Sequence, residues 1–263
     1  MIARSLRVRY RLRWAFRTVL LGIIACAVVA AGLADGAAAQ TVRVGVRAGP
    51  TFGFLNDSAT PFVSADDAGA HPNVRLDLHA GAYAIFPLAD HYGLQTELLY
   101  IRKGGHLSRF ENAGQRVERY RLAYGQAQVL ARRDISLPGP LRLHVLGGVT
   151  GGRLLGGTVR RTVQTEIRVY RETINLTSRR LVRHWDVGAL VGIGLGYPVG
   201  KAGQISLDLR YNRGFRSVFT DRARPLTEQM TGFEDPPPLT RRPPTLRHDA
   251  VTASLSFTTA LSR

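Results

Sequence analysis

The sequence predicts an all-β protein: an eight-stranded antiparallel transmembrane β-barrel with up-and-down topology. Three observations support this prediction. Apolar residues alternate with polar residues or glycine in one segment after another, the apolar positions carry the large side chains, and short connections alternate with long ones. Alternation with a period of two is typical of strands with two unlike faces. Ten strands is the alternative, if residues 158–183 form a membrane hairpin of their own.

The clearest strand signal lies in residues 185–215. The odd positions of residues 185–197 are all apolar or aromatic, whereas the even positions are mainly glycine. Residues 205–211 again alternate apolar with polar side chains, and the short connection 198–203 predicts an antiparallel hairpin. A face of large apolar residues opposite a face of glycine and charge fits a strand with lipid outside and a narrow polar lumen inside.

The other six strands are predicted from the same alternation of apolar and polar residues. They cover, in chain order, residues 42–52, 74–87, 92–103, 119–131, 141–152 and 246–260. In the fourth strand, residues 119–131, the alternation is least regular. Tyr120, Leu122 and Tyr124 are expected to face lipid there, although Gln126 and Gln128 follow on the same face.

The connections between strands alternate in length. The long ones are residues 56–73, 104–118, 153–183 and 216–245, and the short ones are residues 88–91, 132–140 and 198–203. Outer-membrane barrels have short periplasmic turns and longer extracellular loops, whereas a soluble sandwich or a periplasmic lipid-binding barrel has no reason to alternate in this way. Within 153–183, apolar and polar residues alternate again, which predicts that the flanking strands continue past the membrane as a projecting ribbon.

The first 39 residues predict a secretory signal peptide followed by one barrel domain, residues 40–263. A basic segment precedes an apolar run, and three alanines precede Gln40, which indicates cleavage after Ala39 and export to the bacterial outer membrane. Two alternatives remain at this point: an uncleaved membrane anchor, because the apolar run is long, and a lipoprotein processed at Cys26. Cys26 is the sole cysteine, so the mature chain has no disulfide.

Several charged residues occupy the polar faces of the predicted strands and are expected to point into the lumen. They are Arg43, Arg47, Asp77, Glu97, Asp186, Asp208 and Arg210, accompanied by His79 and His144. Carboxylates facing arginines could form an acid–base site. The structural interpretation is simpler: side chains fill an eight-stranded lumen, and buried charges of opposite sign pair there. The lumen is then closed to solutes.

Composition narrows the function further. The formal net charge is +17, nearly all of it from arginine, but there is no basic helix or recognition motif for nucleic acid. The seven histidines are scattered, so neither a metal nor a cofactor is expected. Arginines in the long connections suit outer-membrane lipids, including lipopolysaccharide phosphates, although they could simply be solvated. No protein partner is identified.

We expect a non-enzymatic role in envelope structure or surface interaction. The alternative function is an outer-membrane lipid-modifying enzyme, which would need a nucleophile and a base together on the outer rim. The candidate residues for that rim are His106, Ser108, Glu111 and His184.

Three motifs resemble the outer-membrane β-barrel domain of PorT-like proteins, small barrels of Bacteroidetes-like bacteria. They are residues 44–49 (VGVRAG), residues 94–100 (LQTELLY) followed by Lys103-Gly104, and residues 186–212. The resemblance covers essentially all of the mature chain. It implies an eight-stranded barrel of the OmpA or OmpX shape in the outer membrane, and it implies no particular activity.

Overall fold

The computed structural model describes most of the predicted barrel domain. The described residues are 41–57, 71–111, 114–164, 169–176, 182–200, 203–218 and 246–261. The predicted signal peptide and most of the connections predicted at 56–73 and 216–245 lie outside them. No helix among the described residues is long and apolar enough to cross a membrane.

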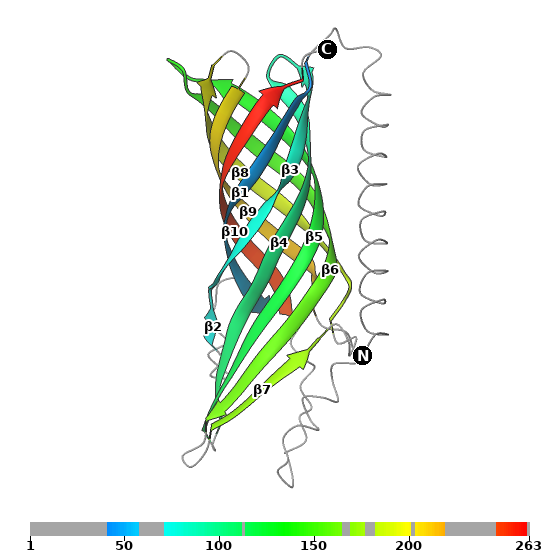
Figure 1. Cartoon of the computed structure of the whole chain (residues 1–263), viewed down its shortest axis with the longest axis vertical. Coiled ribbons are helices and arrows are strands. Elements are labelled where there is room, and N and C mark those ends of the chain that lie inside the picture. Colours follow the sequence, from blue (N-terminus) through cyan, green and yellow to red (C-terminus); the bar gives the residue numbers. More distant parts are fainter. Residues whose placement is uncertain are drawn as a thin grey trace, which may run out of the picture.

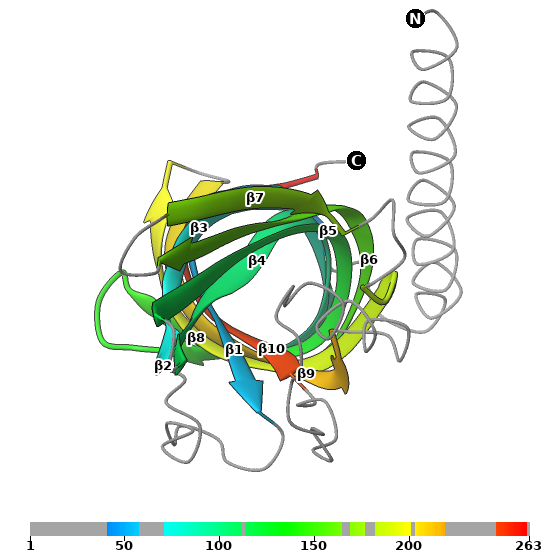
Figure 2. The same cartoon turned by 90° about the horizontal axis from the view of Figure 1, so that it is seen from below.

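Eight strands form the wall of a closed antiparallel barrel (Figures 1 and 2). Their bounds are β1 Arg43–Asp57, β3 Arg75–Ala89, β4 Tyr92–Glu111, β5 Gly114–Ser136, β6 Arg142–Gln164, β8 Trp185–Val199, β9 Gly203–Ser217 and β10 Leu246–Ala260. Each strand pairs with the next along the chain, and β10 pairs with β1 to close the ring. The predicted eight-stranded up-and-down barrel is therefore confirmed.

Two short strands lie outside the ring: β2, His71–Asn73, and β7, Val169–Asn175. β6 continues to Gln164 and β7 pairs antiparallel with its outer part, so a projecting ribbon within residues 153–183 is confirmed. The expected continuation of the following wall strand is wrong, because β8 begins only at Trp185 and the second ribbon strand is the separate β7. The ten-strand alternative is wrong, because β7 spans only seven residues and adds to β6 beyond the closed wall.

The barrel has one short end and one extended end. β1 begins and β10 ends at the short end, where a tight turn joins β3 to β4 and where Val199 of β8 pairs with Gly203 of β9. At the other end β4, β5 and β6 extend beyond the rest of the wall. These three strands have 20, 23 and 23 residues in total, whereas the other wall strands have 15 each. The extensions and β7 form a sheet that projects at the bottom of Figure 1. We call it the outer sheet.

The long connection predicted at residues 104–118 is wrong. β4 continues to Glu111 and β5 begins at Gly114, with the two strands paired throughout. Polar residues suggested a loop there, but beyond a membrane a strand needs no lipid-facing apolar side. The N–H and C=O groups of such a strand are hydrogen-bonded to the neighbouring strands, whatever its side chains are. The turn predicted at 132–140 is also shorter, since β5 runs to Ser136.

The outer wall is apolar and bordered by aromatic residues. Leu195, Leu207 and Leu255 lie opposite one another on β8, β9 and β10, and Leu207 and Leu255 are each 61% exposed. On β8 the apolar stripe runs from Trp185 to Tyr197, which is roughly 28 Å for strand residues of about 3.3 Å at a 45° tilt. This continuous apolar stripe therefore points out of the barrel toward lipid, which excludes the soluble alternative.

The aromatic side chains on this outer wall gather at its two edges, as in outer-membrane barrels. Those toward the short end are Tyr92, Tyr197 and Phe257, and those toward the outer sheet are Phe52, Tyr100, Trp185 and Phe215.

The face predicted for the fourth strand is wrong. Tyr120, Leu122 and Tyr124 point inward and are almost completely buried, as are Gln126 and Gln128. Tyr120, Leu122 and Tyr124 pack with buried apolar residues from several elements toward the outer sheet: Ile101, Leu154, Val159, Ile174, Leu176, Val182 and Val218. We call this cluster the apolar plug. The large apolar side chains of β5 point inward here, whereas the lipid-facing side of the strand carries the small residues Ala123, Gly125 and Ala127, which reverses the usual size pattern.

Candidate functional site

Four charged side chains meet in the middle of the lumen. Arg47 of β1 and Arg210 of β9 both contact Glu97 of β4, at 3.2 Å (Nη1 to Oε2) and 2.7 Å (Nη1 to Oε1). The same two guanidiniums lie 3.6 and 3.7 Å from the carboxylate of Asp208. All four side chains are at most 3% exposed, and their formal charges cancel. We call them the central cluster.

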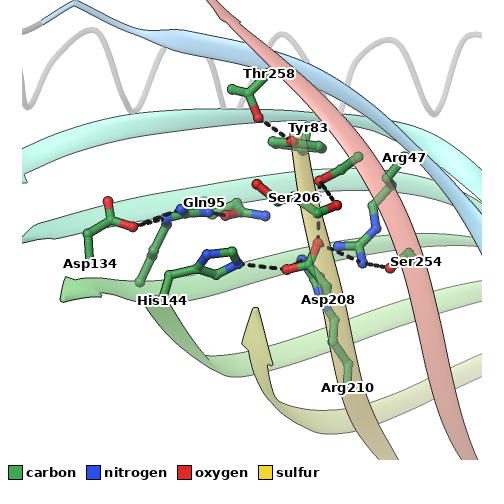
Figure 3. Close-up of polar contacts among 12 residues, drawn as sticks. Arg47, Tyr83, Gln95, Asp134, His144, Ser206, Asp208, Arg210, Ser254 and Thr258 are labelled. Carbon is green, nitrogen blue, oxygen red and sulfur yellow. Dashed lines mark hydrogen bonds and ion pairs between the residues drawn. The ribbon is translucent and has the colours of Figure 1, made fainter. Parts of the chain in front are cut away.

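Neighbouring polar side chains hold the central cluster in place (Figure 3). His144 of β6 lies with Nε2 2.7 Å from Oδ1 of Asp208, and Arg47 donates through Nη2 to the hydroxyl of Ser254 on β10. Gln95 donates its amide to Glu97. Because these groups come from five strands around the ring, the cluster joins opposite walls of the barrel.

Glycines on β8 make room for these long side chains. A Cβ atom at Gly194 would lie 2.3 Å from Nε2 of His144 and 2.5 Å from Oδ1 of Asp208. At Gly192 a Cβ atom would lie 2.7 Å from Cγ of Arg210. The glycine face seen in the sequence is therefore the complement of charged residues on the neighbouring strands.

The polar network continues from the central cluster to the short end. Arg132 of β5 donates to Gln95 at 3.1 Å and lies 2.7 Å from Oδ1 of Asp134. Arg43 contacts the other oxygen of Asp134 at 3.2 Å. Side-chain contacts thus run without a break from the half-buried rim of the barrel to its centre.

A second, smaller polar group lies between the central cluster and the apolar plug. Nζ of Lys103 is 3.2 Å from Oδ2 of Asp186 and lies 5.8 Å from the centre of the Tyr124 ring. His248 packs edge-on against the same ring at 6.0 Å. Both Lys103 and His248 are 1% exposed, so this level of the lumen is also filled.

The residues expected in the lumen occupy five different settings. Arg47, Glu97, Asp208 and Arg210 form the central cluster, with His144 attached, whereas Asp186 pairs separately with Lys103. Arg43 lies at the rim with Asp134, Asp77 pairs with Arg75 two residues before it, and Nδ1 of His79 lies 3.0 Å from the hydroxyl of Thr51. The sequence predicted that these residues face the lumen, but it did not predict which of them contact one another.

Several members of the network were missed. Lys103 shares the parity of Glu97 on the same strand, so extending the alternation by a few residues would have found it. Arg132 was missed because it was placed in the short turn predicted at 132–140, whereas β5 continues to Ser136.

Ser256 and His144 are not arranged as a nucleophile and its base. Ser256 donates through its hydroxyl to Oδ2 of Asp208 at 3.4 Å, while His144 contacts Oδ1. A histidine activates a serine only when it contacts the hydroxyl itself, and here both bond to the carboxylate. Among the described residues, no group of three or more His, Cys, Asp or Glu side chains could hold a metal ion.

Of the candidates for the outer rim, His106, Ser108 and Glu111 all lie on β4. His184 lies apart from them, because it immediately precedes β8 and the wall order places β5 and β6 between β4 and β8.

Replacing Gly194 by alanine should destabilise the barrel by about 1–3 kcal/mol, because the new methyl group displaces the His144–Asp208 contact in a filled lumen. Gly147→Ala on β6 is the matched control, since nothing lies within 4 Å of a Cβ atom at that position. The measurement is urea unfolding of each variant in lipid vesicles. Equal stability of the two variants would show that the lumen is looser than described.

Comparison of the sequence with known protein families supports the assignment as an outer-membrane barrel. A family model described as "Outer membrane protein beta-barrel domain" matches residues 38–220. No curated protein matches the chain.

Similar solved structures include Neisserial surface protein A, with 11% identity, a TM-score of 0.42, and coverage of 86% of this chain and 100% of that one. OprG from Pseudomonas aeruginosa has 9% identity and a TM-score of 0.42, covering 85% and 98%. The protease OmpT from Escherichia coli has 7% identity and a TM-score of 0.42, covering 84% and 97%.

Proposed function

Because the chain belongs to the outer membrane protein β-barrel domain family, we propose that it is a non-enzymatic barrel with a structural or surface-interaction role in the envelope. The observation that carries this proposal is the contrast between the two parts of the molecule. The lumen is filled by ion pairs and the apolar plug, while β4 to β7 extend as an ordered sheet beyond the outer aromatic edge. The outer sheet and its connections are therefore the parts of the protein that would bind other molecules.

Three features of the lumen support a barrel that does not conduct solutes. The central cluster, the Lys103–Asp186 pair and the apolar plug lie at successive levels, and their side chains are almost completely buried. An eight-stranded closure leaves an interior that side chains can fill. Moving a hydrated ion through it would require breaking buried ion pairs, which is costly.

The proposed partners are outer-membrane lipids, with lipopolysaccharide phosphates contacted by arginines outside the membrane. Arg160 and Arg171 belong to the connection predicted at residues 153–183, and both are exposed on the outer sheet. Within the family, the three sequence motifs favour a place among the PorT-like barrels. Export is proposed to use residues 1–39 as a signal peptide that is cleaved after Ala39.

Recording in planar bilayers tests the closed lumen. The purified barrel should give little or no conductance, because each level of the lumen is filled. A variant with alanine at both Glu97 and Arg210 is the informative control, since it should open space while keeping the charge balanced. Large, stable steps from the wild-type protein would contradict the closed lumen and with it the proposed function.

A further inference from the structure

A row of four aligned residues crosses the outer sheet from β4 to β7. His106 lies opposite Arg119, Arg119 opposite Arg160, and Arg160 opposite Thr173. Residues directly opposite on antiparallel strands share a face, with Cβ atoms about 4.5–5.5 Å apart. Arg119, Arg160 and Thr173 are exposed, and His106 is half-buried. Two guanidiniums therefore stand side by side on the outside of the sheet, within reach of one anion.

The row is positively charged and has no internal counter-charge. Like charges directly opposite on a sheet repel. The neighbouring row on the same face, two residues closer to the membrane, contains Arg121, which lies opposite Gly104 of β4 and Thr158 of β6. The neighbouring row two residues farther from the membrane contains Arg171 of β7 opposite Thr162 of β6. Neither row contains a carboxylate at its β4–β7 register positions. The pKa of His106 lies below its ordinary value because of partial burial and the charges of Arg119, Arg75 and Arg121.

The row lies just beyond the outer edge of the membrane. Tyr100 marks that edge on β4, and Arg102 next to it donates through Nε to the Tyr100 hydroxyl at 3.1 Å. On β6 and β8, Arg153 lies 5.8 Å from the centre of the Trp185 ring. From Tyr100 to His106 the strand rises roughly 14 Å at about 3.3 Å per residue and a 45° tilt. Arginine side chains can reach several ångströms back toward the membrane.

We propose that the row formed by His106, Arg119, Arg160 and Thr173, with Arg121 beneath it, binds phosphate groups on the saccharide head of an outer-leaflet glycolipid. This inference deepens the proposed surface role and rests on it. Arginine suits such a group because its planar fork donates two parallel hydrogen bonds to phosphate oxygens. Thr173 adds a hydroxyl donor, and a bound anion relieves the repulsion between Arg119 and Arg160.

The position favours a lipid over a free anion. The row is an open, exposed face and not a pocket, so a small anion would remain largely hydrated and weakly held there. A glycolipid is already concentrated in the membrane against which this face stands, and its acyl chains contribute binding along the apolar wall. Arg102 and Arg121 supply intermediate levels between the aromatic edge and the row.

Native mass spectrometry of the full barrel in neutral detergent tests the proposal with three probes: lipid A, dephosphorylated lipid A and inorganic phosphate. The variant is Arg119→Gln with Arg160→Gln. The matched control is Arg133→Gln with Arg142→Gln, which removes two exposed arginines near the short end. We expect the first variant to bind lipid A about tenfold more weakly or worse than wild type, and the control to bind like wild type.

Four outcomes would overturn the proposal. These are wild-type affinity in the Arg119/Arg160 variant, equal loss in the control, equally tight binding of the dephosphorylated lipid, or displacement of lipid A by millimolar inorganic phosphate. All four changed arginines are exposed, so both variants should fold, and the folded-barrel shift on unheated gels checks this. Bilayer conductance does not depend on these residues, so failure here leaves the closed lumen standing, and the reverse holds too.

Discussion

Replacing Glu97 by glutamine is expected to destabilise the folded barrel by about 3–5 kcal/mol, the range for breaking a buried ion pair from one side. Glu97 has no exposed side-chain surface and accepts from Arg47 and Arg210 together. The substitution keeps the size of the side chain but leaves two guanidiniums sharing Asp208 alone, at 3.6 and 3.7 Å. The effect thus reports on charge and not on packing.

Urea unfolding in lipid vesicles measures this effect, with Trp185 at the membrane edge as the fluorescent reporter. The double variant Glu97→Gln with Arg210→Gln is the control, because it restores the charge balance and leaves Arg47 paired with Asp208. It should be more stable than Glu97→Gln alone. If the free energy of unfolding of Glu97→Gln were within about 0.5 kcal/mol of the wild-type value, the central cluster would not stabilise the barrel.

The sequence predicted the wall of the barrel well where the two faces differ most. On β8 and β9 most large apolar residues at odd positions are exposed on the outer wall, whereas Asp186, Asp208 and Arg210 are buried in the lumen. Parity alone therefore assigned Leu207 and Asp208 to opposite faces. On β5 the same reasoning failed, because the outer lumen is apolar and the lipid-facing side carries small residues such as Ala127. Parity identifies two faces, but it does not say which one meets lipid.

The partners in the lumen could not be predicted from alternation. Arg47 and Glu97 are 50 residues apart in the chain, and Glu97 and Arg210 are 113 apart. Their contact depends on the register of every intervening strand and on how the tilted strands bring different levels together across the ring. The outer sheet was missed at residues 104–118 for a related reason: polar composition indicates exposure to water, which strands beyond a membrane share with loops.

The central claim is that lipid meets the apolar face and paired charges fill the other. Leu207 and Asp208 are adjacent on β9 and test both faces with the same substitution. Leu207 is 61% exposed on the outer wall, so Leu207→Phe should change stability by no more than about 0.5 kcal/mol, because lipid adapts to a larger apolar group.

Asp208→Phe should be far more damaging, because it removes the partner of His144 and weakens the pairing of Arg47 and Arg210. One-sided loss of a buried pair costs about 3–5 kcal/mol, and forcing a ring into a filled lumen adds about 1–3 kcal/mol. Together these are large enough to prevent a stable barrel from forming.

The decisive measurement is folding of the two phenylalanine variants into lipid vesicles, detected by the shift of folded barrel on unheated gels. The structure predicts that Leu207→Phe folds like wild type and that Asp208→Phe does not give a stable folded band. Normal folding of Asp208→Phe together with failure of Leu207→Phe would show that the faces are reversed, and would contradict a barrel with lipid outside and ion pairs within.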